Sequence, residues 1–234
     1  MNGKDIGARI DFHTHSIFSD GALLPAALIR EAEVRGHVAL AITDHVDASN
    51  LEETIKALTK FEKEMKNKLP IKFIPGVEIS YIKPEFIKEY CQKARRLGAK
   101  LIVVHGESPV EPVYPGTNHA AVKEKGLVDI LAHPGNITEE DTILAAKNNI
   151  YLELTARRGH REANRHVAEM ARRFGAKLVV NTDSHNENDL ITQEQAYQIC
   201  REAGLNEEEA LKVIRDHPQE LLLRIEARRS FFQF

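Results

Sequence analysis

Short runs of apolar, often β-branched residues alternate with longer helical segments along the chain, and this alternation limits the fold more than any other feature. Runs of this kind are typical of parallel strands that are covered on both faces. Seven βα units with right-handed crossovers predict an α/β fold, a distorted (β/α)7 barrel one strand short of eight. A doubly wound open sheet is the competing architecture, because periodicity alone does not separate the two. The expected strands are Ala8–His13, Val38–Thr43, Lys72–Ile79, Lys100–His105, Val128–His133, Ile150–Leu154 and Lys177–Thr182.

Helix start and stop signals separate these strands. Proline suits the first helical turn at Pro25 and Pro84, and a glycine follows a helix at Gly36, Gly98, Gly175 and Gly204. No linker or shift in composition marks a boundary, so we expect a single domain over residues 1–234, with the barrel at about 8–204 and C-terminal helices at about 207–228. The expected helices are Pro25–Arg35, Leu51–Lys66, Pro84–Leu97, Asn118–Lys125, Glu139–Asn148, Glu162–Phe174, Gln193–Ala203, Glu207–Arg215 and Pro218–Arg228.

Charge and composition exclude several classes of protein. The formal net charge is −3, which gives no strong nucleic-acid signature of the kind a wide basic face would provide. The two cysteines, Cys91 and Cys200, lie far apart and outside any metal-type spacing, so we expect two reduced, partly buried thiols. No apolar run approaches the ~20 residues needed to cross a bilayer, and the first residues do not resemble a signal peptide. We therefore expect a cytoplasmic protein without a membrane partner.

Polar, chemically active residues follow nearly every expected strand. Six of the eleven histidines fall at or just past the C-terminal end of a strand. In a parallel barrel these ends meet at one mouth, where active sites are found. The motifs are Asp11-Phe12-His13-Thr14-His15 with Ser19-Asp20-Gly21, Thr43-Asp44-His45, Gly76-Val77-Glu78, His105-Gly106-Glu107, His133-Pro134-Gly135 and Thr182-Asp183-Ser184-His185.

The spacing within two of these motifs suits a metal ion. In His13-x-His15 and in Asp183-x-His185 both side chains leave the same face of an extended segment. A single histidine at a strand end is more often a hydrogen-bonded structural residue than a ligand. Six of them crowded together with Asp20, Glu78 and Asp183 would be costly without cations, so the set predicts a metal site.

The remaining histidines are interpreted differently. His37, His166 and His217 are expected to be structural or exposed, because they follow a helix cap, lie in mid-helix and precede a proline, respectively. His119 and His160 fall in or near loops that should overhang the mouth, where they either contact substrate or serve the structure.

The motif set HTHS…SDG, TDH, GVE, VHGE, AHPG and TDSH resembles the PHP (polymerase and histidinol phosphatase) superfamily, in the family's order from about Asp11 to His185. The resemblance implies a PHP-type, TIM-like barrel of seven strands and a centre of two or three divalent ions. By position, the first ion is implied to bind His13, His15, Glu78 and Asp183. Glu78 would bridge to a second ion on His105 and His133, and Asp20, His45 and His185 would bind a third. Some relatives carry a histidine where this chain has Asp20.

The amidohydrolases are the alternative superfamily, since they too begin with His-x-His on the first strand. They typically bridge their ions with a carboxylated lysine at the end of the fourth strand. Here that strand ends in His105 and Lys100 lies at its other end, so Glu78 is the expected bridge. Mixed imidazole and carboxylate ligands suit Zn, Mn or Fe better than Mg or Ca.

This site predicts a metal-dependent phosphoesterase, an enzyme that hydrolyses ester bonds. Three dications and three carboxylates leave a positive centre that attracts a phosphomonoester dianion, and a metal-bound water held by Glu78, His13, Asp183 and His105 would be the nucleophile. The expected partner is a small phosphorylated substrate, with histidinol phosphate as one candidate. A phosphodiesterase or exonuclease acting on nucleotides or single-stranded nucleic acid is the second hypothesis, and a non-enzymatic metal-binding module is the third.

Other side chains near the mouth have two interpretations each. Arg157, Arg158 and Arg161 follow the sixth strand and would either clamp a phosphate or form a solvated turn. Asp11 and Asp44 precede ligand histidines and would either orient an imidazole or cap a strand end.

Overall fold

The computed structural model describes residues 5–229, so residues 1–4 and 230–234 of the expected single domain lie outside the described residues. The described strands are all parallel and follow the order β1-β2-β4-β5-β6-β7-β8, with β3 pairing with β4. Both β2 and β3 pair with β4, one after the other, so the eight strands fill seven positions. The strands are β1 (Arg9–Asp11), β2 (His37–Ile42), β3 (His45–Val46), β4 (Lys72–Ile79), β5 (Leu101–His105), β6 (Ile130–Ala132), β7 (Tyr151–Thr155) and β8 (Leu178–Asn181).

The first and last strand positions meet just past β1 and β8, which closes the sheet into a barrel. A parallel bridge joins Thr14 and Ser184, the His15 N–H donates to the Ser184 carbonyl at 2.8 Å, and the Asp183 N–H donates to the His13 carbonyl at 2.9 Å. Further from the mouth, a side chain replaces backbone pairing at the seam between β1 and β8: the Phe12 N–H donates to Asn181 Oδ1 at 3.0 Å. The predicted seven-position barrel is confirmed, and the open-sheet alternative is wrong.

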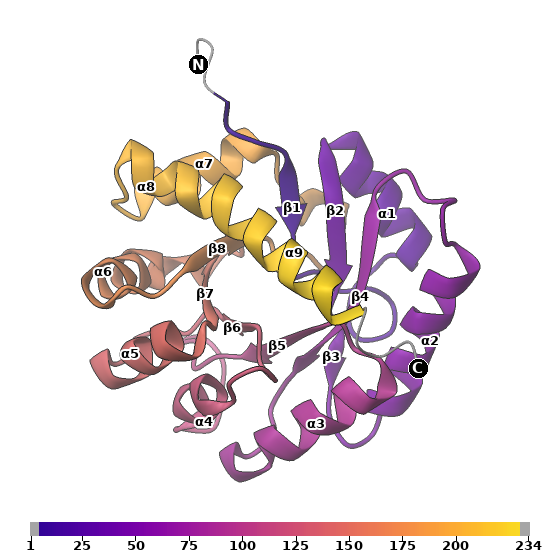
Figure 1. Cartoon of the computed structure of the whole chain (residues 1–234), viewed down its shortest axis with the longest axis horizontal. Coiled ribbons are helices and arrows are strands. Elements are labelled where there is room, and N and C mark those ends of the chain that lie inside the picture. The colour runs from indigo at the N-terminus through magenta and orange to yellow at the C-terminus, as the bar shows by residue number, and fades with distance from the viewer. Residues whose placement is uncertain (1–4, 230–234) are drawn as a thin grey trace.

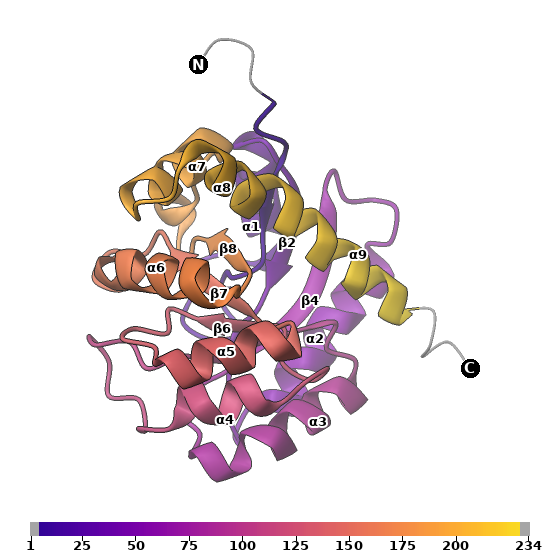
Figure 2. The same ribbon diagram turned by 60° about the vertical axis from the view of Figure 1, so that its left-hand side comes forward.

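Helices surround the barrel, as Figures 1 and 2 show. Their bounds lie within a few residues of those expected, although 3₁₀ turns at Pro84–Phe86 and Arg161–Ala163 replace the first turn of two predicted helices. A π-helical turn at Lys212–Asp216 joins the last two helices without a break. The helices are α1 (Pro25–Val34), α2 (Leu51–Glu64), α3 (Ile87–Leu97), α4 (Thr117–Lys123), α5 (Glu139–Asn148), α6 (Asn164–Phe174), α7 (Gln193–Glu202), α8 (Glu207–Leu211) and α9 (His217–Arg229).

Helix α9 covers one end of the barrel, crossing the front of the molecule in Figure 1. Its Leu221 and Ile225 are buried and belong to the same apolar cluster as Ile10, Phe12 and Ile74 of the barrel interior. Burying an aliphatic side chain of this size stabilises the fold by about 2 kcal/mol. Because α9 fills the end at which the strands begin, the carboxyl ends of the strands remain for the mouth.

Four predicted strands end earlier than expected, each next to the site, and the first of them is β1, which stops at Asp11 and not at His13. Strand β2 stops at Ile42 and pairing with β4 resumes at His45, because the Thr43 N–H donates to the Thr14 carbonyl of the neighbouring segment instead. Strands β6 and β8 end at Ala132 and Asn181, just before residues whose φ is positive, His133 and Asp183. The pairing pattern therefore breaks where the functional side chains begin.

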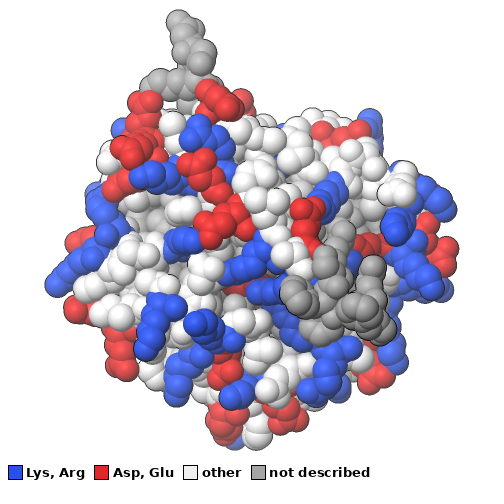
Figure 3. Space-filling model, viewed as in Figure 1, with Lys and Arg blue, Asp and Glu red and all other residues white. Residues whose placement is uncertain are grey.

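The charge distribution on the surface and the state of the two cysteines agree with the expectations from the sequence. Figure 3 shows acidic and basic side chains interspersed over the face crossed by α9. Cys91 and Cys200 are free and buried, and burial raises the pKa of each thiol to about 12. Within residues 5–229, no helix has both the length and the apolar character that crossing a bilayer requires.

Candidate metal centre

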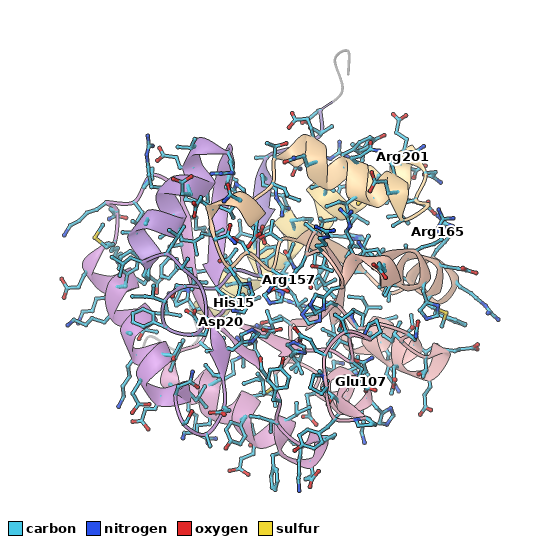
Figure 4. All side chains as sticks on the ribbon, turned by 180° about the vertical axis from the view of Figure 1, so that it is seen from behind. His15, Asp20, Glu107, Arg157, Arg165 and Arg201 are labelled. Atoms are coloured by element: carbon cyan, nitrogen blue, oxygen red, sulfur yellow. The ribbon has the colours of Figure 1, made fainter. Side chains whose placement is uncertain are left out.

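The predicted ligands gather at the mouth of the barrel. Figure 4 looks at this side of the molecule and shows His15, Asp20 and Arg157 together near its centre, whereas Arg165 and Arg201 lie at the periphery. Among the described residues, three groups of donor atoms lie within 4.8 Å of one another: His13, His15 and Asp183; His13, Glu78 and His133; and His15, Asp20, His45 and His185. Eight of the nine expected ligands belong to these groups.

Two segments at the β1–β8 seam form the first group. Asp183 Oδ1 lies 3.1 Å from His15 Nε2 and 3.7 Å from His13 Nε2. Two donors bound to one zinc ion at 2.0–2.2 Å stand about 3.3 Å apart in tetrahedral geometry. The separations within this group are therefore those of ligands that share one ion.

Glu78, at the end of β4, links the first group to the second. Its Oε1 lies 3.4 Å from His13 Nε2 and 3.7 Å from His133 Nε2, and its Oε2 lies 3.7 Å from His15 Nε2. The carboxylate is fully buried and faces a fourth imidazole as well, because its Oε2 lies 2.6 Å from His45 Nδ1. This is the central position that a bridging carboxylate needs.

The third group opens to solvent. His185 Nε2 lies 3.2 Å from Asp20 Oδ2, and His45 Nε2 lies 3.8 Å from Asp20 Oδ1. The rings of His45 and His185 each lie 4.2 Å from that of His15. The Asp20 side chain is 57% exposed, so this group is the most accessible of the three.

His105 stands apart from the three groups. Its Nε2 contacts Glu111 Oε2 at 2.6 Å, although its ring remains 4.5 Å from that of His133. Glu111 belongs to the loop between β5 and α4. The position of this carboxylate in space was not predicted.

Glu153 is a buried carboxylate that the sequence analysis missed. It lies in the middle of β7; its Oε1 contacts His13 Nδ1 at 2.8 Å and accepts a bond from Asn181 Nδ2 at 2.8 Å, and its Oε2 accepts from the His133 N–H at 3.0 Å. It thus fixes the ring of one candidate ligand and the backbone of another. The available signal was one acidic residue inside an otherwise apolar strand.

Asp11 and Asp44 contact backbone and side-chain groups at the strand ends. The imidazole beside Asp11 is that of His37, 3.9 Å away, which is not an expected ligand. Asp11 pairs with Arg9 at 2.9 Å and accepts the Thr182 N–H at 3.3 Å. Asp44 accepts bonds from the Ser16 N–H at 2.6 Å and from the Ser19 hydroxyl at 2.9 Å. Of the two interpretations, the geometry favours a role in holding the strand ends and the loop that carries Asp20.

The predicted substrate residues differ in position. Arg157 lies at the centre, where it donates to the Asp183 carbonyl at 3.0 Å and contacts His185 Nδ1 at 2.6 Å. His160 is buried, and its ring lies 4.5 Å from that of His133. Arg158 and Arg161 are exposed. His119 pairs with Asp141 at 2.7 Å, between α4 and α5.

The three histidines expected outside the site have backbone partners. His37 Nδ1 lies 2.9 Å from the Ala32 carbonyl, His166 Nε2 lies 2.8 Å from the Ile137 carbonyl, and His217 Nδ1 lies 2.7 Å from the Leu178 carbonyl. Each of these contacts joins the histidine to a neighbouring element of the fold.

Electrostatics divide the imidazoles of the cluster into two sets. Burial alone would lower the pKa of His13, His45 and His105, but the neighbouring carboxylates outweigh it and raise all three, that of His45 to about 9. Burial and the neighbouring imidazoles hold the pKa of His15 and of His133 well below the ordinary value. Burial would raise the pKa of Glu78, but His13, His45 and His105 outweigh it and hold that pKa well below its usual range. Neutral imidazole and ionised carboxylate are the forms that bind a metal ion.

Buried polar atoms without hydrogen-bond partners test whether cations fit this site. Among the described residues they include His13 Nε2, both nitrogens of His15, the Glu78 carboxylate oxygens and Asp183 Oδ1. Leaving such a group unsatisfied costs about 1–3 kcal/mol, and more when the group is charged. These atoms face one another within ligand distance, so the residues fit a cluster of divalent ions.

Backbone strain is concentrated at the same place. His133 has φ of 24° and Asp183 has φ of 51°, values that are uncommon for residues with side chains. Gly106 allows a close approach, because a Cβ there would lie 2.2 Å from the Ala132 carbonyl oxygen. The strands around the mouth are thus held in positions that aim the side chains inward.

A cavity of about 1500 Å³ opens at the other end of the barrel, between α2, α3 and α9. Its lining includes Phe73, Leu97 and Ile225 but no member of the three donor groups. Cavity size therefore does not locate the candidate metal centre. The donor groups at the mouth of the barrel locate it.

Comparison with known proteins decides the family. A sequence model described as PHP domain matches residues 11–154, more than half of the chain. The chain belongs to the PHP domain family. This PHP protein is 47% identical to an uncharacterized protein of Methanocaldococcus jannaschii, over 93% of this chain and 100% of that protein.

Two further relatives of the PHP protein carry functional names. It is 28% identical to the DNA polymerase/3'-5' exonuclease PolX of Bacillus subtilis, over 75% of this chain and 34% of that protein. It is 26% identical to a probable phosphatase of Acetivibrio thermocellus, over 84% of this chain and 87% of that protein.

Solved structures share the barrel of this PHP protein. Histidinol phosphate phosphatase of Lactococcus lactis, determined with zinc, L-histidinol and phosphate, has a TM-score of 0.61 at 18% identity, over 85% of this chain and 95% of that one. A chain of archaeal ribonuclease P with mature tRNA has a TM-score of 0.68 at 17% identity, over 96% and 93%. The PHP protein is a metal-dependent hydrolase of the phosphoesterase class, as the sequence predicted.

Proposed function

We propose that this protein is a phosphatase that hydrolyses a small phosphomonoester at a centre of two or three divalent ions. The observation that carries the proposal is the set of buried, unpartnered imidazole and carboxylate atoms that face one another beside Arg157. Such a set costs free energy without cations and becomes favourable when they bind.

The three donor groups suggest how the ions would be held. His13, His15 and Asp183 would hold the first, with Glu78 shared between it and a second ion on His133 and His105. Asp20, His45 and His185 would hold the third, next to His15. Zinc, manganese and iron suit these mixed ligands. When bound, divalent ions lower the pKa of a water nucleophile and neutralise charge on the phosphate.

Around the ions, residues of the chain would orient the reactants. Arg157 is one-third exposed and fixed by Asp183 and His185, so its free N–H groups are available for a phosphate oxygen. His160 lies beside His133 in the wall of the site, with Nε2 3.5 Å from Glu111 Oε1, and would contact the leaving group. Exposed Arg158 and Arg161 would contribute less.

The net charge favours a monoester over a polynucleotide. A formal charge of −3 gives no wide basic face to hold the flanking phosphates of a nucleic-acid strand, whereas a monoester brings a single phosphate to the ions. The probable phosphatase among the relatives supports this choice, and the structural neighbour crystallised with histidinol makes histidinol phosphate one candidate substrate.

A substrate panel tests the proposal. Protein loaded with Mn²⁺ or Zn²⁺ is incubated with small phosphomonoesters, including histidinol phosphate and nucleoside monophosphates, and with a single-stranded oligonucleotide. Release of inorganic phosphate from at least one monoester, with the oligonucleotide intact, is the expected result. A loaded protein that degrades the oligonucleotide and leaves all monoesters intact would show that the exonuclease alternative is correct. Glu78→Gln should abolish the activity.

A further inference from the structure

Glu111 lies outside the ligand set implied by the family resemblance, yet it lies within hydrogen-bond distance of one of those ligands. Its Oε2 lies 2.6 Å from His105 Nε2, and its Oε1 lies 3.5 Å from His160 Nε2. The Tyr81 hydroxyl donates to the same Oε2 at 3.1 Å. Glu111 is thus surrounded by two imidazoles and a hydroxyl at the edge of the cluster.

The loop that carries Glu111 is firmly anchored. Glu107 Oε1 accepts the N–H groups of Gly116 at 3.1 Å and of Asn118 at 2.8 Å, and Asn118 Oδ1 accepts the Glu107 N–H at 2.9 Å. Prolines at 109, 112 and 115 restrict the backbone between these anchors. A carboxylate on such a loop is held in place before any ligand arrives.

The hydrogen bonds of His105 leave its Nε2 for a cation. Its Nδ1 lies 3.1 Å from the Gly106 carbonyl, which can only accept, so Nδ1 carries the proton. In the neutral ring Nε2 then presents a lone pair directly to the Glu111 carboxylate. Two acceptors at 2.6 Å repel each other, so a positive group must stand between them. Without an ion that group is a second proton on the ring, and an ion in its place would hold the two atoms about 3.3 Å apart.

We propose that Glu111 is a ligand of the second ion, which it shares with His105. This inference rests on the metal centre of the proposed function. The chain then supplies a fourth carboxylate to the cluster, beside Asp20, Glu78 and Asp183, and binds the second ion from the solvent side. Tyr81 is a positioning residue, because its hydroxyl holds the carboxylate oxygen that faces His105.

Metal counting tests the role of Glu111 independently of catalysis. Metal-free wild-type protein and the Glu111→Gln variant are titrated with Zn²⁺ in competition with a chelator, and bound ions are counted by elemental analysis after dialysis. We expect Glu111→Gln to retain one ion fewer than the wild type, or to bind one ion 10- to 100-fold more weakly. Glu85→Gln removes the same charge from an exposed site and should bind as the wild type does.

Two more variants make the result decisive. Tyr81→Phe keeps the ring and should weaken the same ion by less than Glu111→Gln does. Glu111→Ala, with its fold checked by circular dichroism, should reproduce the loss. Unchanged ion counts and affinities within twofold in both Glu111 variants would overturn the inference, as would tighter binding. If Glu111→Gln loses an ion while the wild type hydrolyses no phosphomonoester, only the proposed substrate class is refuted.

Discussion

Replacing Glu153 by glutamine should weaken metal binding although the glutamate touches no ion in the proposed arrangement. The side chain is fully buried and satisfies three groups, His13 Nδ1, Asn181 Nδ2 and the His133 N–H, at 2.8–3.0 Å. Glutamine has the same shape but only one accepting oxygen. Whichever way the amide is oriented, its NH₂ group faces at least one donor that the carboxylate now satisfies.

The size of the effect follows from these contacts. Loss of a residue that orients a ligand imidazole typically costs 10- to 100-fold in metal affinity, or about 1.4–2.7 kcal/mol. Hydrogen bonds to a buried charged group contribute about 1.5–3 kcal/mol, so the metal-free protein should also lose about 2 kcal/mol of its free energy of unfolding.

Two measurements check the Glu153→Gln prediction, a Zn²⁺ competition titration and urea unfolding of the metal-free protein. Glu169→Gln is the matched control, because Glu169 is exposed on α6 and the substitution removes the same charge. A zinc affinity within twofold of the wild type, together with an unchanged free energy of unfolding, would refute the idea that Glu153 orients His13.

The remaining predictions concern pH, the substrate and the closed end of the barrel. Burial raises the pKa of Asp183 to about 6 in the metal-free protein. Protons should therefore compete with the ion, and Zn²⁺ affinity measured by calorimetry should fall as the pH is lowered from 7.5 to 5; a constant affinity would contradict this. Arg157→Ala should lower kcat/KM for a phosphomonoester by about 10- to 100-fold, the loss of a charged hydrogen bond, whereas exposed Arg158→Ala should have little effect. Equal losses would be inconsistent with a clamp at Arg157. Leu221→Ala should lower the free energy of unfolding by about 2–5 kcal/mol because it leaves a cavity under α9, and Leu223→Ala on the same helix, at a side chain 63% exposed, should change it by less than about 0.5 kcal/mol. Urea denaturation measures both, and similar values would show that α9 does not seal the barrel.

Buried strands made the fold predictable from the sequence. Strand β4 has the expected bounds because an apolar run defines it locally. Helix α5 has the expected bounds because Thr138 caps its first turn. The break after β2 was not predictable in this way, since it depends on a hydrogen bond from Thr43 to Thr14, a residue of the neighbouring segment. A local sequence pattern does not reveal a hydrogen-bond partner that is remote in the sequence.

The same distinction applies to the site. Histidines such as His13 and His185 were found because short motifs at strand ends converge in any parallel barrel. Glu153 was missed because one acidic residue within a strand has no spacing that marks it. Glu111 was missed because only the path of its loop brings it to His105. Residues that act through their neighbours need coordinates to be recognised.

The seam between β1 and β8 has a consequence for how the protein is made. His13 and His15 come from the start of the chain, and Asp183 and His185 follow the last strand, with Asp183 and His185 joined to the opening segment by a few backbone bonds at the mouth. About 170 residues separate His13 from Asp183. We therefore expect a nascent chain to complete the first donor group only after all the strands between them have been synthesised.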